Sequence, residues 1–83
     1  MKTSSVKFAR LRRMLLDLQF SESRTDRFWR FEHLQSDTIF LFRPYRQDEN
    51  VNMADLVGTR NQLEWRGLLA ADSFDDQLTK APA

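Results

Sequence analysis

The stretch RFWRFEHLQSDTIFLFRP, residues 27–44, contains two apolar runs separated by polar residues that favour a turn. Alternate side chains of a strand point to the same face, so Trp29, Phe31 and His33 share one face of the first run. The second run, TIFLF at 38–42, is apolar or β-branched throughout, which is typical of a largely buried strand. The stretch therefore predicts an antiparallel hairpin.

The hairpin is also expected to supply the sheet's share of the core. A chain of 83 residues buries only about 60% of its unfolded surface, so it needs its large apolar side chains inside. Aromatic residues at alternate positions are therefore interpreted as core and not as a stacking platform for nucleic-acid bases. The ribonucleoprotein sheet pattern also needs glycines around its stacking aromatics, and this stretch has none. The predicted core residues of the hairpin are Trp29, Phe31, Phe40 and Phe42, with Arg30 and Glu32 on the opposite, open face.

A helix is predicted before the hairpin. Phe8, Leu11, Leu15 and Leu18 follow one another at the spacing of one helical stripe, and Ser4 or Ser5 can cap the helix start. A short strand over 20–24 then leads to a turn before the hairpin.

A second helix is predicted after the polar loop that follows Pro44. Asn52 is a suitable N-cap, and Asp55 lies in the first turn, where the helix polarity favours an acid. Gly67 is expected to end the helix in the left-handed conformation. The apolar side of this helix is predicted to hold Leu56 and Leu63, together with Met53, Val57 and Trp65.

The element order predicts an α+β fold, α-β-β-β-α, with a three-stranded antiparallel sheet and both helices packed on one face. Residues 1–69 are expected to form a single domain. Residues 70–83 are expected to form a C-terminal tail with a brief helical turn around Phe74 and a mobile end at Lys80–Ala83.

Charge is distributed unevenly along the chain. Residues 1–46 contain ten Lys or Arg against five Asp or Glu, whereas residues 47–83 contain three against seven. A basic half can meet phosphates, although proteins that bind no polyanion show the same asymmetry. The candidate RNA-binding residues are Lys7, Arg10, Arg13, Arg24, Arg27 and Arg30.

Composition excludes several other classes of function. The chain has no cysteine, which removes disulfides, thiolate nucleophiles and the usual structural zinc sites. The adjacent acids at 48–49 and 75–76 lack the glycine-containing loop of a calcium site, so neither a metal nor another cofactor is expected. No apolar run approaches the roughly 20 residues that cross a bilayer, and the N-terminus lacks a secretory signal. We expect a cytoplasmic protein.

The segments LRRMLLDLQF, FWRFEHLQSDTIFLFRP and VNMADLVGTRNQLEWRGLL resemble the HicA family of toxins from bacterial toxin–antitoxin pairs. The counterparts of the family's elements are Leu15–Phe20, the strand that ends at Pro44, and Leu56–Leu68. The resemblance covers about residues 6–69. It implies a fold like that of double-stranded-RNA-binding domains, a ribonuclease that cuts messenger RNA, and an antitoxin protein as partner.

The family's Gly-Ser-His catalytic signature is missing at the matching place, where this chain has Asp26, Arg27 and Phe28. A phenyl ring cannot transfer protons, so Phe28 cannot replace the histidine. His33 is a weak candidate catalyst, because its odd offset from Phe28 directs it to the other face of the strand unless a bulge intervenes. The resemblance thus implies a catalytically degenerate RNA-binding domain. The alternatives are a protein-interaction module that binds no nucleic acid and, less favoured, an active mRNA interferase that uses His33.

Overall fold

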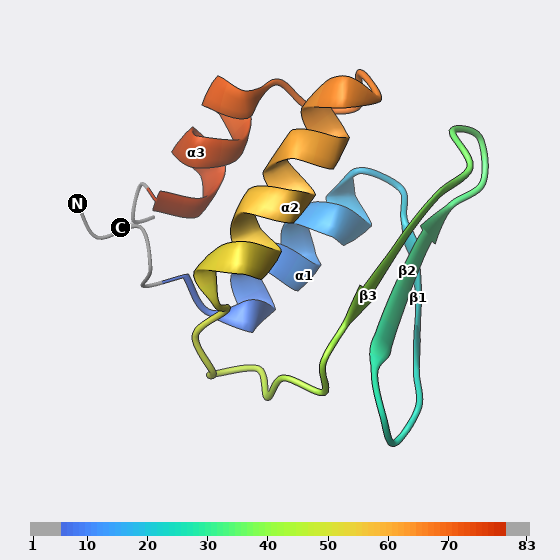
Figure 1. Cartoon of the computed structure of the whole chain (residues 1–83), viewed down its shortest axis with the longest axis vertical. Coiled ribbons are helices and arrows are strands. Elements are labelled where there is room, and N and C mark those ends of the chain that lie inside the picture. Colours follow the sequence, from blue (N-terminus) through green and yellow to red (C-terminus); the bar gives the residue numbers. More distant parts are fainter. Residues whose placement is uncertain (1–5, 80–83) are drawn as a thin grey trace.

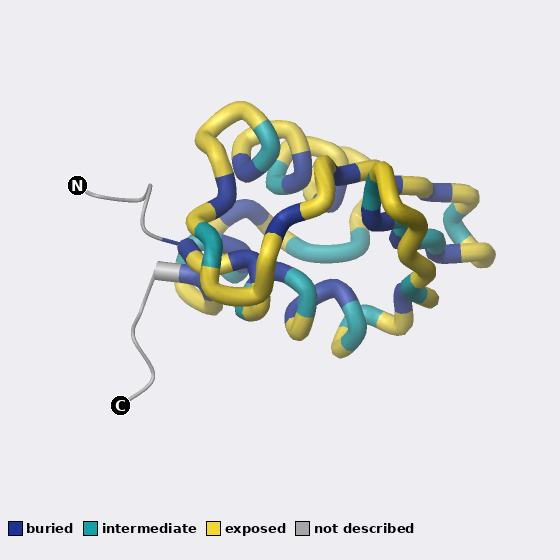
Figure 2. The backbone as a smooth tube through the Cα atoms, turned by 90° about the horizontal axis from the view of Figure 1, so that it is seen from below, coloured by how far each residue is buried: buried dark blue, intermediate teal, exposed yellow. Residues whose placement is uncertain are grey.

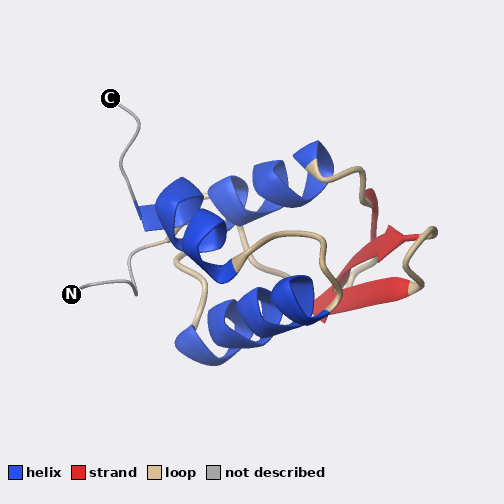
Figure 3. Cartoon of the chain, turned by 90° about the horizontal axis from the view of Figure 1, so that it is seen from above, coloured by secondary structure: helices blue, strands red, loops and turns tan. Residues whose placement is uncertain are grey.

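The predicted hairpin forms the middle and one edge of a three-stranded antiparallel sheet in the computed structural model, which describes residues 6–79. The sheet order is β1-β2-β3, and all three helices lie on the same side of the sheet (Figures 1 and 3). The predicted α+β class and the sheet are confirmed, and one further helix follows them. The elements are α1 (Phe8–Asp17), β1 (Ser21–Arg24), β2 (Trp29–His33), β3 (Thr38–Phe42), α2 (Met53–Trp65) and α3 (Ala71–Thr79).

The strand register places the hairpin's aromatic side chains on the face that the helices cover. Trp29 lies opposite Phe42, and Phe31 lies opposite Phe40. All four side chains are buried, as predicted, and buried positions alternate with half-buried ones in β2 and with exposed ones in β3 (Figure 2). The alternation of β2 and β3 therefore decides which face of the sheet meets the core.

The N-terminus of α1 is held by the loop that follows β3. The helix begins at Phe8, later than the predicted start, and its N-cap Lys7 makes no side-chain capping bond. Backbone carbonyls of the loop accept the otherwise free amides instead, with Phe8 N–H donating to the oxygen of Glu49 at 2.8 Å and Ala9 N–H to that of Gln47 at 3.0 Å. The proposed capping residues Ser4 and Ser5 lie outside the described residues.

Helix α2 has the predicted caps but not the predicted apolar side. Asn52 Oδ1 accepts the Asp55 amide at 2.8 Å, and Gly67 has a φ of 73° just beyond the helix. Leu56 and Leu63 are buried as expected, together with Thr59. The expectation for the other three apolar residues was wrong. At about 100° per residue, Val57 and Trp65 point away from the Leu56–Leu63 face, whereas Met53 is the first residue of the helix. The exposed side chains are Met53, Val57 and Trp65.

The segment after α2 is a helix of nine residues, longer than the brief turn expected around Phe74. Phe74 and Leu78 are buried in the common core. Arg60 of α2 forms two hydrogen bonds to the Asp75 carboxylate, at 3.0 and 3.3 Å, and Arg10 of α1 donates to the Gln77 carbonyl. Residues 80–83, for which mobility was expected, lie outside the described residues.

Candidate functional site

Of the three N-terminal basic candidates, Lys7 is the N-cap residue before α1, and Arg10 and Arg13 lie in α1 outside its buried stripe. Lys7 and Arg13 are exposed and Arg10 is half-buried. Arg13 pairs with Asp17 one turn later at 3.4 Å, and Arg10 Nη1 donates to the Gln77 carbonyl at 3.1 Å. Lys7 makes no ion pair with any residue of the described range 6–79. Among these three, only Arg13 forms an ion pair within that range, and Arg10 is held by a hydrogen bond to a neutral carbonyl.

The other three candidates are spread around the β1–β2 hairpin. Arg24 lies over the ring of Trp29 at 5.0 Å from its centroid, and Arg27 is exposed in the connecting turn. Arg30 lies on the sheet face opposite the helices and pairs with Glu32 at 3.0 Å. Because α1 covers one face of the sheet and Arg30 projects from the other, the six candidates do not share one surface.

One arginine that the sequence analysis left out makes the strongest ion pair of this region. Arg12 donates to both carboxylate oxygens of Glu22, at 2.6 and 2.8 Å, and joins α1 to β1. The Arg12 hydrogen bonds lower the pKa of the Glu22 carboxyl, although partial burial acts in the opposite direction. The same Arg12 guanidinium lies 5.8 Å from the centroid of Trp29. The pair therefore belongs to the packing of α1 against the sheet.

Acid should weaken this link in a predictable way. Because folding lowers the pKa of Glu22, its contribution is present above the unfolded pKa near 4.5 and is lost as pH falls through the lower folded value. We expect Glu22→Gln to lower the unfolding free energy by about 1 kcal/mol at pH 7. In this variant the unfolding free energy should also fall less between pH 6 and pH 3 than in the natural chain. Urea unfolding across that range measures both effects. Asp17→Asn, in the exposed pair with Arg13, is the control and should change neither by more than a few tenths of a kcal/mol.

His33, the weak catalytic candidate, lies in a hydrogen-bonded chain that closes the β2–β3 turn. Its side chain is 8% exposed and packs on Phe20, with 5.2 Å between the ring centroids. Nδ1 lies 2.8 Å from Ser36 Oγ, which in turn lies 2.7 Å from Thr38 Oγ1. The Ser36 amide also donates to Nδ1 at 3.3 Å, so this nitrogen is the acceptor. A serine hydroxyl beside an imidazole resembles a nucleophile–base pair, but here both groups hold the turn in place.

Phe28, at the place of the family's histidine, is half-buried just before β2. Its amide donates to Thr25 Oγ1, and its carbonyl accepts the Thr25 amide at 2.9 Å, which closes the β1–β2 turn. By strand alternation Phe28 lies on the same side as Arg30, away from the side that carries His33. Phe28 and His33 therefore do not form one site.

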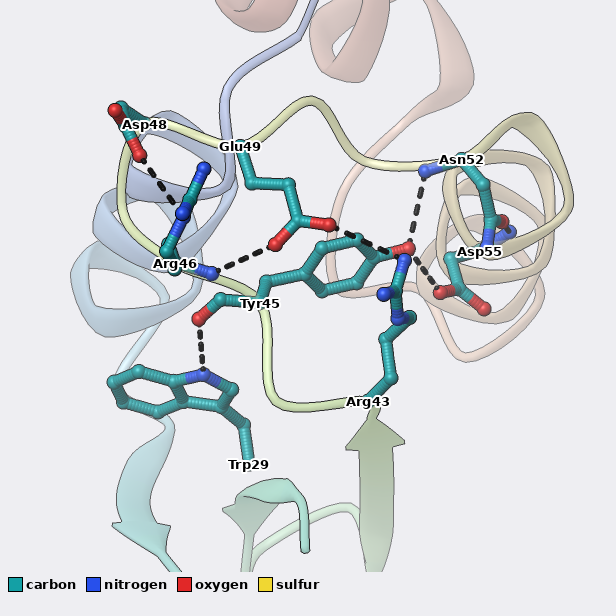
Figure 4. Close-up of polar contacts among 8 residues, drawn as sticks. All are labelled: Trp29, Arg43, Tyr45, Arg46, Asp48, Glu49, Asn52 and Asp55. Carbon is teal, nitrogen blue, oxygen red and sulfur yellow. Dashed lines mark hydrogen bonds and ion pairs between the residues drawn. The ribbon is translucent and has the colours of Figure 1, made fainter. Parts of the chain in front are cut away.

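A polar network around Tyr45 joins the loop after β3 to two other elements, β2 and α2 (Figure 4). Tyr45 is 1% exposed; its hydroxyl donates to Asp55 Oδ2 at 2.6 Å and accepts the Asn52 amide at 3.0 Å. Its carbonyl accepts Trp29 Nε1–H at 3.0 Å. Burial raises the pKa of the Tyr45 hydroxyl, and the Asn52 amide partly offsets this effect. The network connects β2, the loop and the start of α2.

The surface that the sequence analysis missed is apolar. We call the sheet face opposite the helices the outer sheet face; it carries Ser21, Ser23, Arg30, Glu32, Ile39 and Leu41. Ile39 is 46% exposed and Leu41 is 59% exposed, and both come from β3. The alternation that buries Phe40 also predicts their outward direction, but the continuous apolar run led us to expect a largely buried strand.

A second exposed apolar region lies at the end of α2. Trp65 is 79% exposed and lines a shallow surface cavity of about 530 Å³ with Asn61, Gln62 and Glu64. Leu34 in the β2–β3 turn is also exposed. Arg66 connects the two segments, since its Nη1 donates to the Ser36 carbonyl at 3.0 Å.

Within residues 6–79, no group of three or more His, Cys, Asp or Glu side chains could hold a metal ion. In the same range, no helix is both long and apolar enough to cross a membrane. No protein-family model, curated protein or solved structure matches this chain.

Proposed function

We propose that this chain is a protein-interaction module that binds its partner through the outer sheet face and the neighbouring edge of β3. The observation that carries the proposal is the pair Ile39 and Leu41, two large aliphatic side chains exposed side by side on one edge strand. A small protein needs most of its large aliphatic side chains in the core. Exposed aliphatic side chains that neighbour each other on one strand face are typical of partner contacts.

The charges around this surface support a protein partner over a nucleic acid. Arg30, the arginine of the outer sheet face, is already paired with Glu32, so the face presents no net cation there. Ser21 and Ser23, on β1 at the other edge of this face, add no charge to it. Phosphate binding depends on unpaired cations that release counterions, and this face offers none among its described residues. An antitoxin-like protein, the partner that the HicA resemblance implies, belongs to the proposed class.

Site-directed photo-crosslinking in the protein's own cells tests the proposal. Benzoylphenylalanine at Leu41 should give a protein adduct of defined mass, whereas the same group at Ser23 on β1 should give less. The captured protein should also co-purify with the unmodified chain and be lost from Leu41→Lys. If benzoylphenylalanine at Leu41 crosslinks to no protein, the proposal is contradicted.

Duplex RNA is the competing partner and needs its own measurement. Fluorescence anisotropy with a labelled 20-base-pair RNA should show no saturable binding at 50 mM salt. If RNA binds and its affinity falls steeply towards 200 mM salt, as phosphate contacts require, the RNA-binding alternative replaces the proposal. Charge-removal variants of Lys7, Arg13 and Arg27 then identify the phosphate contacts.

A further inference from the structure

We propose that the partner of the β3 edge is a second copy of this chain, which pairs with β3 antiparallel about Phe40; this inference rests on the proposed function. Within residues 6–79, β3 pairs only with β2, so its other edge is open (Figure 1). An open edge presents unpaired backbone N–H and C=O groups. Natural edge strands are commonly protected by charge or proline, but Thr38–Phe42 contains neither.

The side chains of β3 complement themselves under two-fold symmetry. Antiparallel pairing centred on Phe40 places Ile39 opposite Leu41 of the partner subunit, and the symmetry repeats this contact. The four aliphatic side chains then form one cluster on the outer sheet face. Cross-strand aliphatic pairs of this kind stabilise antiparallel sheets. No two like charges face each other within the paired strands.

Charged residues at the two ends of β3 fit the same register. Asp37 precedes the strand in a turn, with a φ of 57°, and Arg43 follows the strand, so the pairing about Phe40 brings Asp37 near Arg43 of the partner subunit. Asp37 is exposed and has no ion pair among residues 6–79. Arg43 is 58% exposed and pairs with Glu49 at 3.3 Å, which leaves part of its guanidinium accessible. Opposite charges at both ends favour this register over one shifted along the strand.

The two-fold axis would run perpendicular to the sheet, so the two three-stranded sheets join edge to edge and the helices of both copies stay on one face. Two strands of five residues bury less surface than a permanent dimer, for which about 2,000 Å² or more is usual. The expected dimer is therefore weak and reversible.

Sedimentation equilibrium of the purified full chain tests the dimer. The apparent mass should rise with concentration from 9.9 kDa towards twice that value. Leu41→Lys should weaken dimerisation at least tenfold, and Ser23→Lys, on the other edge of the outer sheet face, should leave it unchanged. A chain that stays monomeric up to millimolar concentration overturns the inference. If crosslinking at Leu41 then still captures another protein, the proposed function stands without the dimer; if it captures none, both fail.

Cysteine pairing tests the register, because the chain has no cysteine of its own. Mixed Ile39→Cys and Leu41→Cys chains should form an interchain disulfide several-fold faster than either variant alone. Ser23→Cys is the control and should react at the background rate. Asp37→Asn, which suits the φ of 57° at this position, should weaken dimerisation several-fold. Faster pairing of Ile39→Cys or of Leu41→Cys with itself contradicts the register about Phe40.

Discussion

Replacing Phe8 by alanine is expected to remove a large part of the protein's unfolding free energy at 25 °C. Phe8 is fully buried, and its ring meets four others: Trp29 at 5.1 Å, Phe31 at 6.3 Å, Phe42 at 6.0 Å and Tyr45 at 5.3 Å between centroids. Truncation of a buried phenylalanine costs about 3–5 kcal/mol through lost transfer free energy and the cavity that remains. The total unfolding free energy of a native protein is only about 5–15 kcal/mol, so the loss is a large fraction of it.

Urea unfolding followed by far-ultraviolet circular dichroism measures this effect. Phe28→Ala is the matched control, because Phe28 is half-buried and its ring lies outside the aromatic cluster of the described residues. We expect Phe28→Ala to cost about 1 kcal/mol or less. Equal losses for the two variants would show that the cluster around Phe8 is not the centre of the core.

Truncation of Tyr45 should have the next largest effect, and two variants separate its ring from its hydroxyl. Tyr45→Ala removes a buried ring stacked on Phe8 and should cost about 3–5 kcal/mol. Tyr45→Phe keeps the ring but leaves the Asn52 amide and the Asp55 carboxylate without their partner, at a cost of about 1–2 kcal/mol. The same urea measurement distinguishes the two contributions.

Alkaline pH provides an independent check on the Tyr45 hydroxyl. Burial raises the folded-state pKa of Tyr45 above its unfolded value near 10, so its contribution is fully present below pH 10 and is lost as pH rises through the folded value. The unfolding free energy of the natural chain should fall above pH 10 more steeply than that of Tyr45→Phe. Identical alkaline profiles would show that the hydroxyl is not buried in solution.

Local patterns were sufficient for the sheet and for the caps of α2. Alternation in residues 29–33 and 38–42 predicts which side chains turn inward, because it depends only on the two-residue repeat of a strand. The Asn52 cap and the Gly67 terminator likewise follow from bonds made within a few residues. These features could be predicted because the residues that determine them are close to one another in the sequence.

The candidate site was less predictable. The six basic residues were chosen by charge, but whether each charge is available depends on partners brought close by folding. The Gln77 carbonyl that accepts from Arg10 is 67 residues away in the chain. The exposed pair Ile39 and Leu41 could have been found from alternation, yet the same run TIFLF also fits a strand buried on both faces. Only the position of the helices, all on one side of the sheet, decides between the two interpretations.

The amino-acid sequence by itself determined the α+β class, the hairpin and the inward direction of its aromatic rings, since each follows from short-range backbone geometry. The tertiary structure alone decided how α1 is capped by the 47–49 carbonyls, which arginines are paired, and which apolar side chains stay exposed. The physical reason is the same in each case: hydrogen bonds, ion pairs and burial depend on the distance between atoms in space, and that distance is set by the packing of whole elements.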